Sequence, residues 1–211
     1  MKVQAAGLEG ELNVPPAATG VVIFAHGSGS SRHSPRNRYV ADLLNQGGLA
    51  TLLIDLLSAG EQAVDLETAQ LRFDIPFLAD RLVAITRWLR REPQVADLKT
   101  GYFGASTGAG AALVATTEVP LMIHAVVSRG GRPDLAGDAL ERVEAPTLAI
   151  VGGNDRVVLE LNRQALARMH CPKHLEIIPG AGHLFEEPGA LAQVAALARA
   201  WFLRSLTVAA R

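Results

Sequence analysis

Residues 100–116 read TGYFGASTGAGAALVAT, and this stretch decides the fold. Its first part, 100–103, is a short strand-like run, whereas the alanine-rich part 109–116 suits a helix. Between them, Gly104-Ala105-Ser106-Thr107-Gly108 has the form G-x-S-x-G. The two glycines allow a sharp turn from strand to helix, which pushes the central Ser106 out at the tip. The stretch therefore predicts a strand, a tight turn with an exposed serine, and a helix.

The same alternation continues on both sides of this stretch. Short runs that are apolar on both faces alternate with segments of helical period, as in a parallel sheet covered by helices. Strands are predicted at 21–25, 51–54, 100–103, 125–127, 147–151 and 175–178, with an antiparallel edge hairpin at 2–6 and 11–14. Helices are predicted from Pro35 to Gly47, along 78–91 and along 191–202. The expected fold class is α/β, with a mostly parallel central sheet between two helical layers.

Length and composition fit one domain, residues 1–211. With 49 % hydrophobic and 19 % charged residues, the chain is not disordered. The formal net charge of −1 argues against nucleic acid as a partner. The single Cys171 cannot form an internal disulfide, which suits a cytoplasmic location. No signal peptide, membrane span or metal cluster is expected, and 127–146 is too short to hold a cap domain.

Three polar side chains stand where predicted strands end. Ser106 follows 100–103, Asp155 follows 147–151, and His183 follows 175–178. Because the carboxyl ends of parallel strands meet at one edge of a sheet, these side chains should lie together. A serine hydroxyl needs an adjacent base at neutral pH, and the base needs a carboxylate to orient it. The order predicts a triad with Ser106 as nucleophile, His183 as base and Asp155 as orienting acid.

Each of these residues also has a structural interpretation. A G-x-S-x-G string arises by chance in a chain with 20 glycines. His183 could cap the last helix, and Asp155 could be the N-cap of the helix that follows it. Together, however, these alternatives require three coincidences of residue type, order and position, so the triad is the better interpretation.

Acyl transfer also needs hydrogen-bond donors for the oxyanion that develops. The backbone N–H of Thr107 stands at the start of a helix and is the first expected donor. The second is Ser28 in the loop His26-Gly27-Ser28-Gly29, with Gly29 as the alternative. His26 itself is expected to hold this loop by hydrogen bonds rather than to act as a second base.

With these segments in view, the chain resembles the α/β-hydrolases, and among them the dienelactone hydrolase-like group. The resemblance is carried by His26-Gly27-Ser28-Gly29, Gly104-Ala105-Ser106-Thr107-Gly108, Gly153-Asn154-Asp155 and Gly180-Ala181-Gly182-His183-Leu184-Phe185, and it extends from Val21 onward. It implies a three-layer α/β-hydrolase fold without a cap domain. It also implies a thiol nucleophile and an acidic residue in the first loop, whereas this chain has Ser106 and no carboxylate in 28–33. A serine carboxylesterase is therefore the expected variant.

Arg32 and Arg129 follow strands at the reactive edge and are candidate substrate-binding residues. Guanidinium groups pair with carboxylate or phosphate, although a solvated surface is the alternative interpretation. The expected function is hydrolysis of carboxylic esters or lactones of small substrates, anionic ones among them, through an acyl-enzyme. Acyl transfer and a catalytically silent ligand- or partner-binding protein are the alternatives. The chain should need no metal or organic cofactor and act on a small molecule as a monomer or homodimer.

Overall fold

Eight strands form one sheet in the computed structural model, which describes residues 1–207. They are β1 (Lys2–Ala5), β2 (Leu8–Asn13), β3 (Val21–Ala25), β4 (Ala50–Ile54), β5 (Thr100–Ala105), β6 (Ile123–Arg129), β7 (Thr147–Gly152) and β8 (Lys173–Ile178). Their order is β1-β2-β4-β3-β5-β6-β7-β8. The β1-β2 and β2-β4 pairs are antiparallel, and the other neighbours are parallel. The mostly parallel sheet and its edge hairpin, predicted from the sequence, are confirmed.

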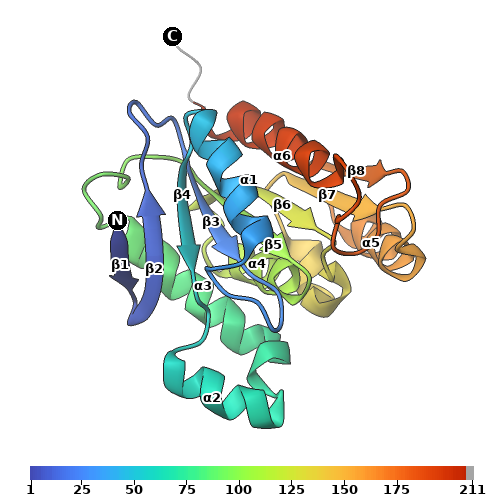
Figure 1. The fold of residues 1–211 in the computed structure, drawn as a ribbon, viewed down its shortest axis with the longest axis horizontal. Helices are drawn as coiled ribbons and strands as arrows, with labels where there is room; N and C mark the ends of the chain where they lie inside the picture. Colours follow the sequence, from blue (N-terminus) through green and yellow to red (C-terminus); the bar gives the residue numbers. More distant parts are fainter. Residues whose placement is uncertain (208–211) are drawn as a thin grey trace.

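Helices cover both faces of the sheet and give the fold three layers (Figure 1). On one face lie α1 (Pro35–Gln46) and α6 (Ala190–Leu206), which share a hydrophobic cluster. The other face carries α3 (Ile75–Leu89), α4 (Thr107–Glu118), α5 (Arg156–Arg168) and the 3₁₀ segment η2 (Pro133–Arg142). The remaining elements are α2 (Ala59–Thr68) and the short 3₁₀ turn η1 (Leu71–Phe73).

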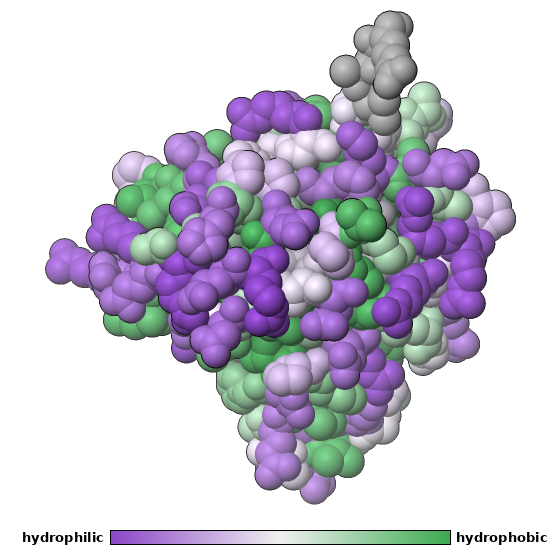
Figure 2. All heavy atoms as spheres, turned by 180° about the vertical axis from the view of Figure 1, so that it is seen from behind, coloured by the Kyte–Doolittle hydropathy of each residue, from purple (hydrophilic) through white to green (hydrophobic). Residues whose placement is uncertain are grey.

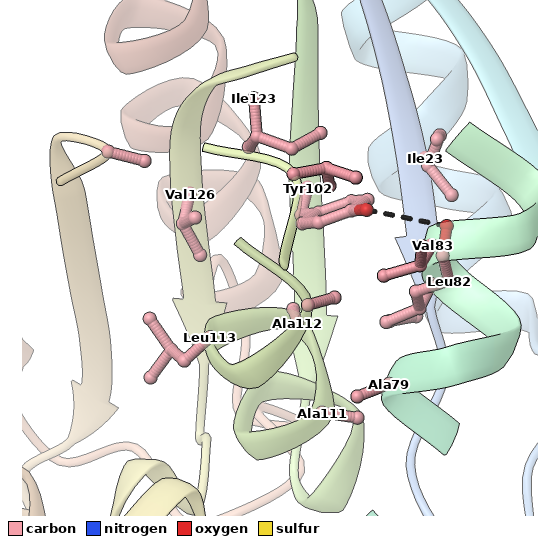
Figure 3. Packing of buried hydrophobic residues seen from close by; sticks show 14 of the residues in the cluster. Ile23, Ala79, Leu82, Val83, Tyr102, Ala111, Ala112, Leu113, Ile123 and Val126 are labelled. Carbon is pink, nitrogen blue, oxygen red and sulfur yellow. Dashed lines mark hydrogen bonds between the residues drawn. The ribbon is translucent and has the colours of Figure 1, made fainter. Parts of the chain in front are cut away.

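The central strands are buried on both faces because helices cover both. Every residue of β3, β4 and β5 is buried, as the unbroken apolar runs of the sequence predict. Toward α3, Tyr102 lies among aliphatic side chains (Figure 3) and its hydroxyl forms a hydrogen bond of 2.5 Å with Thr86. Toward α6, a methyl group placed on Gly101 would lie 2.7 Å from a ring carbon of Phe202. These contacts fix the sheet between its two helical layers.

One helix was not predicted from the sequence. α2 projects from the lower edge of the molecule in Figure 1, beyond the carboxyl end of β4. Its Val64 and Leu66 are 56 % and 73 % exposed, and apolar spheres appear at this edge in Figure 2. No helix within residues 1–207 is long and apolar enough to cross a membrane.

Candidate active site

Ser106 lies at the junction of β5 and α4 in a strained conformation. Its backbone angles are φ 49° and ψ −123°, a region that residues with a side chain rarely adopt and that costs about 1–3 kcal/mol. Neighbouring backbone groups hold it there. The Ser106 N–H donates to the Arg129 carbonyl at 3.4 Å, and the Ser106 carbonyl accepts from the Arg132 N–H at 3.0 Å. The turn therefore presents the serine side chain at the carboxyl end of the sheet.

Gly108 makes this turn possible because β3 runs directly against it. A methyl group placed on Gly108 would lie 2.2 Å from the Ala25 carbonyl oxygen and 2.5 Å from that of His26. Backbone atoms cannot swing away as the end of a long side chain can. The last glycine of G-x-S-x-G is therefore required by packing.

His183 and Asp155 meet at the same edge of the sheet. Asp155 follows β7, His183 follows β8, and the distance from His183 Nδ1 to Asp155 Oδ2 is 2.7 Å. Since a carboxylate can only accept, Nδ1 carries the hydrogen of this bond. In a neutral imidazole, Nε2 is then free to accept a proton. The pair thus has the arrangement that a general base and its orienting acid require.

Ser106 and His183 both adjoin one dipeptide, Arg129-Gly130. The carbonyl of Arg129 accepts from Ser106, and a methyl group placed on Gly130 would lie 3.5 Å from His183 Nδ1. Gly130 has φ +49°, so a side chain there would be strained as well as crowded. Within residues 1–207 the Ser106 hydroxyl has no hydrogen-bond partner, and catalytic hydrogen bonds are often long before a ligand binds. The structure therefore joins His183 to Asp155 but does not join Ser106 to His183.

The two expected oxyanion donors lie together, but one is engaged. The Ser28 N–H donates to Thr107 Oγ1 at 3.0 Å. This bond draws the first loop against the start of α4, so that both amides lie at the same turn. The neighbouring N–H of Gly29, the alternative donor, has no protein partner among the described residues.

His26 has the structural role expected of it. Its Nε2 accepts from the Leu56 N–H at 3.1 Å, and its Nδ1 contacts the Gly27 carbonyl at 3.0 Å. Since Nε2 is the acceptor, the hydrogen stands on Nδ1 and the ring is neutral. Burial lowers the pKa of His26 below its usual value of 6.5, against the opposing effect of Gly27. His26 therefore links the first loop to the segment after β4.

Arg32 is occupied by protein carboxylates. Its backbone N–H donates to Asp55 Oδ1 at 2.6 Å, its Nη1 pairs with Asp55 Oδ2, and its Nη2 lies 2.6 Å from Glu9 Oε2. Pairing with Asp55, which ends β4 at the same edge of the sheet, could be considered from the sequence, whereas pairing with Glu9 could not. Two carboxylates leave this guanidinium little capacity for an anionic substrate, contrary to the expectation.

A cavity that is open to solvent adjoins the site on the α3 side of the sheet. Thr107 and Ser28 link it to the expected oxyanion donors. Its lining includes leucines 56, 57, 66 and 78 and, as polar residues, Gln62, Asp65 and Arg72. Neither Arg32 nor Arg129 lines it. The cavity is therefore largely apolar and lies beside the expected oxyanion donors.

Arg72 is a cavity residue that the sequence analysis missed. Its Nε donates to Asp65 Oδ2 and its Nη2 to the Asp65 carbonyl, both at 2.6 Å, so one carboxylate ties η1 to α2. A usable signal was present in the sequence. Ser58 and Glu61 form a capping box, in which each side chain bonds to the other's backbone N–H. This S-x-x-E pattern predicts that a helix begins after Ser58, and that helix supplies part of the cavity wall.

The fold and the arrangement of this site define an α/β-hydrolase. The chain belongs to the dienelactone hydrolase family, whose model matches residues 8–206. A crystal structure of a dienelactone hydrolase from Anabaena variabilis has 60 % identity and a TM-score of 0.94, covering 98 % of this chain and 96 % of that one. Est1E from Butyrivibrio proteoclasticus has a TM-score of 0.78 at 16 % identity, covering 97 % of both this chain and that one, and shows the shared fold alone.

Two curated relatives from Mycobacterium tuberculosis carry a different name. Each is 58 % identical over 197 residues, which is 93 % of this chain but 44 % of the relative. Both are named "Putative phosphoribosyl transferase". The chain thus spans less than half the length of these proteins, and their name describes a longer molecule than the matched segment.

Proposed function

We propose that this chain is a serine hydrolase that cleaves carboxylic esters or lactones of small substrates. Ser106 is the nucleophile, His183 the general base and Asp155 the acid that orients it. The observation that supports this most strongly is the 2.7 Å hydrogen bond between His183 and Asp155. The strained backbone of Ser106, at the carboxyl end of the same sheet, supports it as well. Membership of the dienelactone hydrolase family supports the hydrolytic chemistry.

The proposed reaction has two halves. Ser106 Oγ bonds to the acyl carbon while its proton moves to His183 Nε2. The imidazolium then gives this proton to the departing alkoxide, and the acyl group remains on Ser106. In the second half, water loses a proton to His183 and attacks the acyl-enzyme, and the same proton returns to Ser106 Oγ. Asp155 stays ionised and stabilises the imidazolium throughout.

The oxyanion is proposed to accept from the Thr107 N–H and from one amide of the first loop. Ser28 supplies that amide if the oxyanion takes the place of the Thr107 hydroxyl as its acceptor, and Gly29 is the alternative. Preorganised donors of this kind contribute about 10²–10³ in rate each. The leucine-lined cavity beside them suits a short apolar acyl or alcohol group.

Labelling with a fluorophosphonate tests the proposal directly. The probe should attach to Ser106, and Ser106→Ala should prevent labelling and lower turnover of an activated short ester at least about 10⁴-fold. Cys171→Ala is the matched control, because it removes the single thiol, which lies away from the site and is buried. That variant should keep both labelling and turnover. Attachment at another residue, or unchanged turnover in Ser106→Ala, would remove Ser106 from the mechanism.

A further inference from the structure

Arg129 is buried without a partner for its charge. It ends β6, only 8 % of it is exposed, and its Nε and Nη1 form no hydrogen bond within residues 1–207. Burying a charged group is costly unless that group is paired and hydrogen-bonded. Every other arginine discussed above has a carboxylate beside it, whereas the charge of Arg129 has none within residues 1–207.

A second arginine adjoins it. Burial, and to a smaller extent the positive charge of nearby Arg36, lowers the pKa of Arg129 to about 10. Arg129 therefore stays charged at neutral pH. Arg36 lies in the first turn of α1, and its own Nε is also buried without a partner. Its Nη1 lies 3.3 Å from the exposed Glu186, the one carboxylate that the described structure places against this pair.

The guanidinium of Arg129 lies on the face of the sheet opposite the cavity. Side chains alternate along a strand, and Val127 packs in the cluster of α1 and α6 whereas Val126 packs in that of α3 and α4. Two residues after Val127, Arg129 points to the α1 and α6 side. Its backbone still bonds to Ser106, so the two groups share one strand end. The N-terminus of α1, which favours negative charge, begins at Pro35 on the same side.

We propose that Arg129 and Arg36 form an anion-binding site beside the triad, which takes a carboxylate or phosphate group. A guanidinium fork pairs with either group through two parallel hydrogen bonds, and two adjoining forks match an oxyanion with several acceptors. The anion is either an acidic group of the substrate or a free oxyanion. The possibility that the substrate supplies the anion rests on the proposed function, whereas the binding of an anion at this site does not.

Binding is tested with inorganic phosphate at constant ionic strength. Phosphate should raise the unfolding temperature of the wild-type chain, and more so at higher phosphate concentration. It should raise the unfolding temperature of Ser106→Ala by the same amount. Arg129→Met should weaken phosphate binding about 10- to 100-fold. Arg168→Met is the matched control, since it removes the same charge from an arginine already paired with Asp138 and Glu141. It should respond to phosphate like the wild type.

The stability of Arg129→Met without phosphate separates a ligand site from a structural residue. Removing an unpaired buried charge should leave the unfolding temperature in phosphate-free buffer unchanged or higher. A lower unfolding temperature together with an unaltered phosphate response would overturn the proposal. If that variant does not fold, Arg36→Met decides, because it should also weaken phosphate binding, and an unchanged response there would overturn the proposal as well.

Two esters of matched length distinguish the sources of the anion. 4-Nitrophenyl hydrogen succinate carries a free carboxylate, and 4-nitrophenyl butyrate does not. If the substrate supplies the anion, Arg129→Met should lower kcat/KM about 10- to 100-fold for the succinyl ester alone, and phosphate should compete with that ester alone. If both esters are unaffected while phosphate binding is lost, the site takes a free oxyanion. Loss of neither property in Arg129→Met would overturn the proposal.

Discussion

At the scale of single residues, the turn that carries Ser106 depends on the absence of a side chain at Gly108. Gly108→Ala would drive a methyl group into the backbone carbonyls of Ala25 and His26. We expect a loss of about 3 kcal/mol in the free energy of unfolding, at the upper end for overpacked sites. Gly60→Ala, in α2 with open space around it, should instead stabilise by up to about 1 kcal/mol. Urea denaturation of both variants checks this, and equal effects would contradict it.

His26 makes a pH-dependent contribution to stability. Burial lowers its pKa in the folded chain below 6.5, so the unfolded chain binds more protons as the pH falls below that value. Stability should therefore decrease from pH 6.5 downward until the folded pKa is passed, by at most about 1.4 kcal/mol per pH unit. His26→Gln should flatten this part of the curve.

Comparing the wild type with His26→Gln separates the contribution of His26 to the pH dependence from that of other groups. Burial also lowers the pKa of His124, which contributes in the same direction in both. Unfolding free energies at pH 5, 6 and 7.5 provide the measurement. Parallel curves for the wild type and His26→Gln would mean that His26 takes up a proton as readily in the folded chain as in the unfolded one.

At the scale of elements, burial determines what the sequence could predict. The central strands were predicted because apolar residues cover both of their faces. The edge hairpin was predicted only as two weaker segments before Pro15, and the structure shows that β2 alternates between buried and more exposed residues. α2 was missed because its apolar Val64 and Leu66 face solvent and its single buried residue is Asp65. A capping box and an ion pair hold this helix instead of an apolar stripe, so the hydrophobic period carries no signal.

The same reasoning explains which site residues the sequence could predict. Ser106, Asp155 and His183 follow strands, and strand order places them at one edge. Arg32, in contrast, meets Glu9 only because β2 lies beside β4, and the sequence does not show that proximity. The burial of Arg129 is likewise a property of the assembled layers, and the sequence does not show it.

Asp65 should fix the position of α2 and so the wall of the cavity. It accepts from the backbone N–H of Arg72 at 3.0 Å and from its Nε. Asp65→Ala should free α2, which we expect to appear as faster amide exchange across 59–73 and a higher KM for short esters. Glu67→Ala, an exposed carboxylate of the same helix, is the control and should change neither. Unchanged exchange in Asp65→Ala would show that other contacts hold the helix.

At the scale of the whole molecule, the two helical layers cover opposite faces of the sheet in the described residues 1–207. Cluster residues on the α1 and α6 side and those on the α3 and α4 side share the strands but pack separately. Trp88 lies in α3 and Trp201 in α6, so each layer carries one fluorescent reporter. The variants Trp88→Phe and Trp201→Phe then report on one layer each.

Phe202→Ala tests whether the chain unfolds as one domain, as its length predicts. Phe202 is fully buried in α6 against Gly101, so its loss should cost about 3–5 kcal/mol. Leu121→Ala, at a position 90 % exposed, should cost less than about 0.5 kcal/mol and serves as the control. If the sheet couples the layers, Phe202→Ala should shift the urea midpoints reported by Trp88 and Trp201 equally. A shift of the Trp201 midpoint alone would mean that α6 detaches before the sheet unfolds, and would leave two cooperative units in place of one.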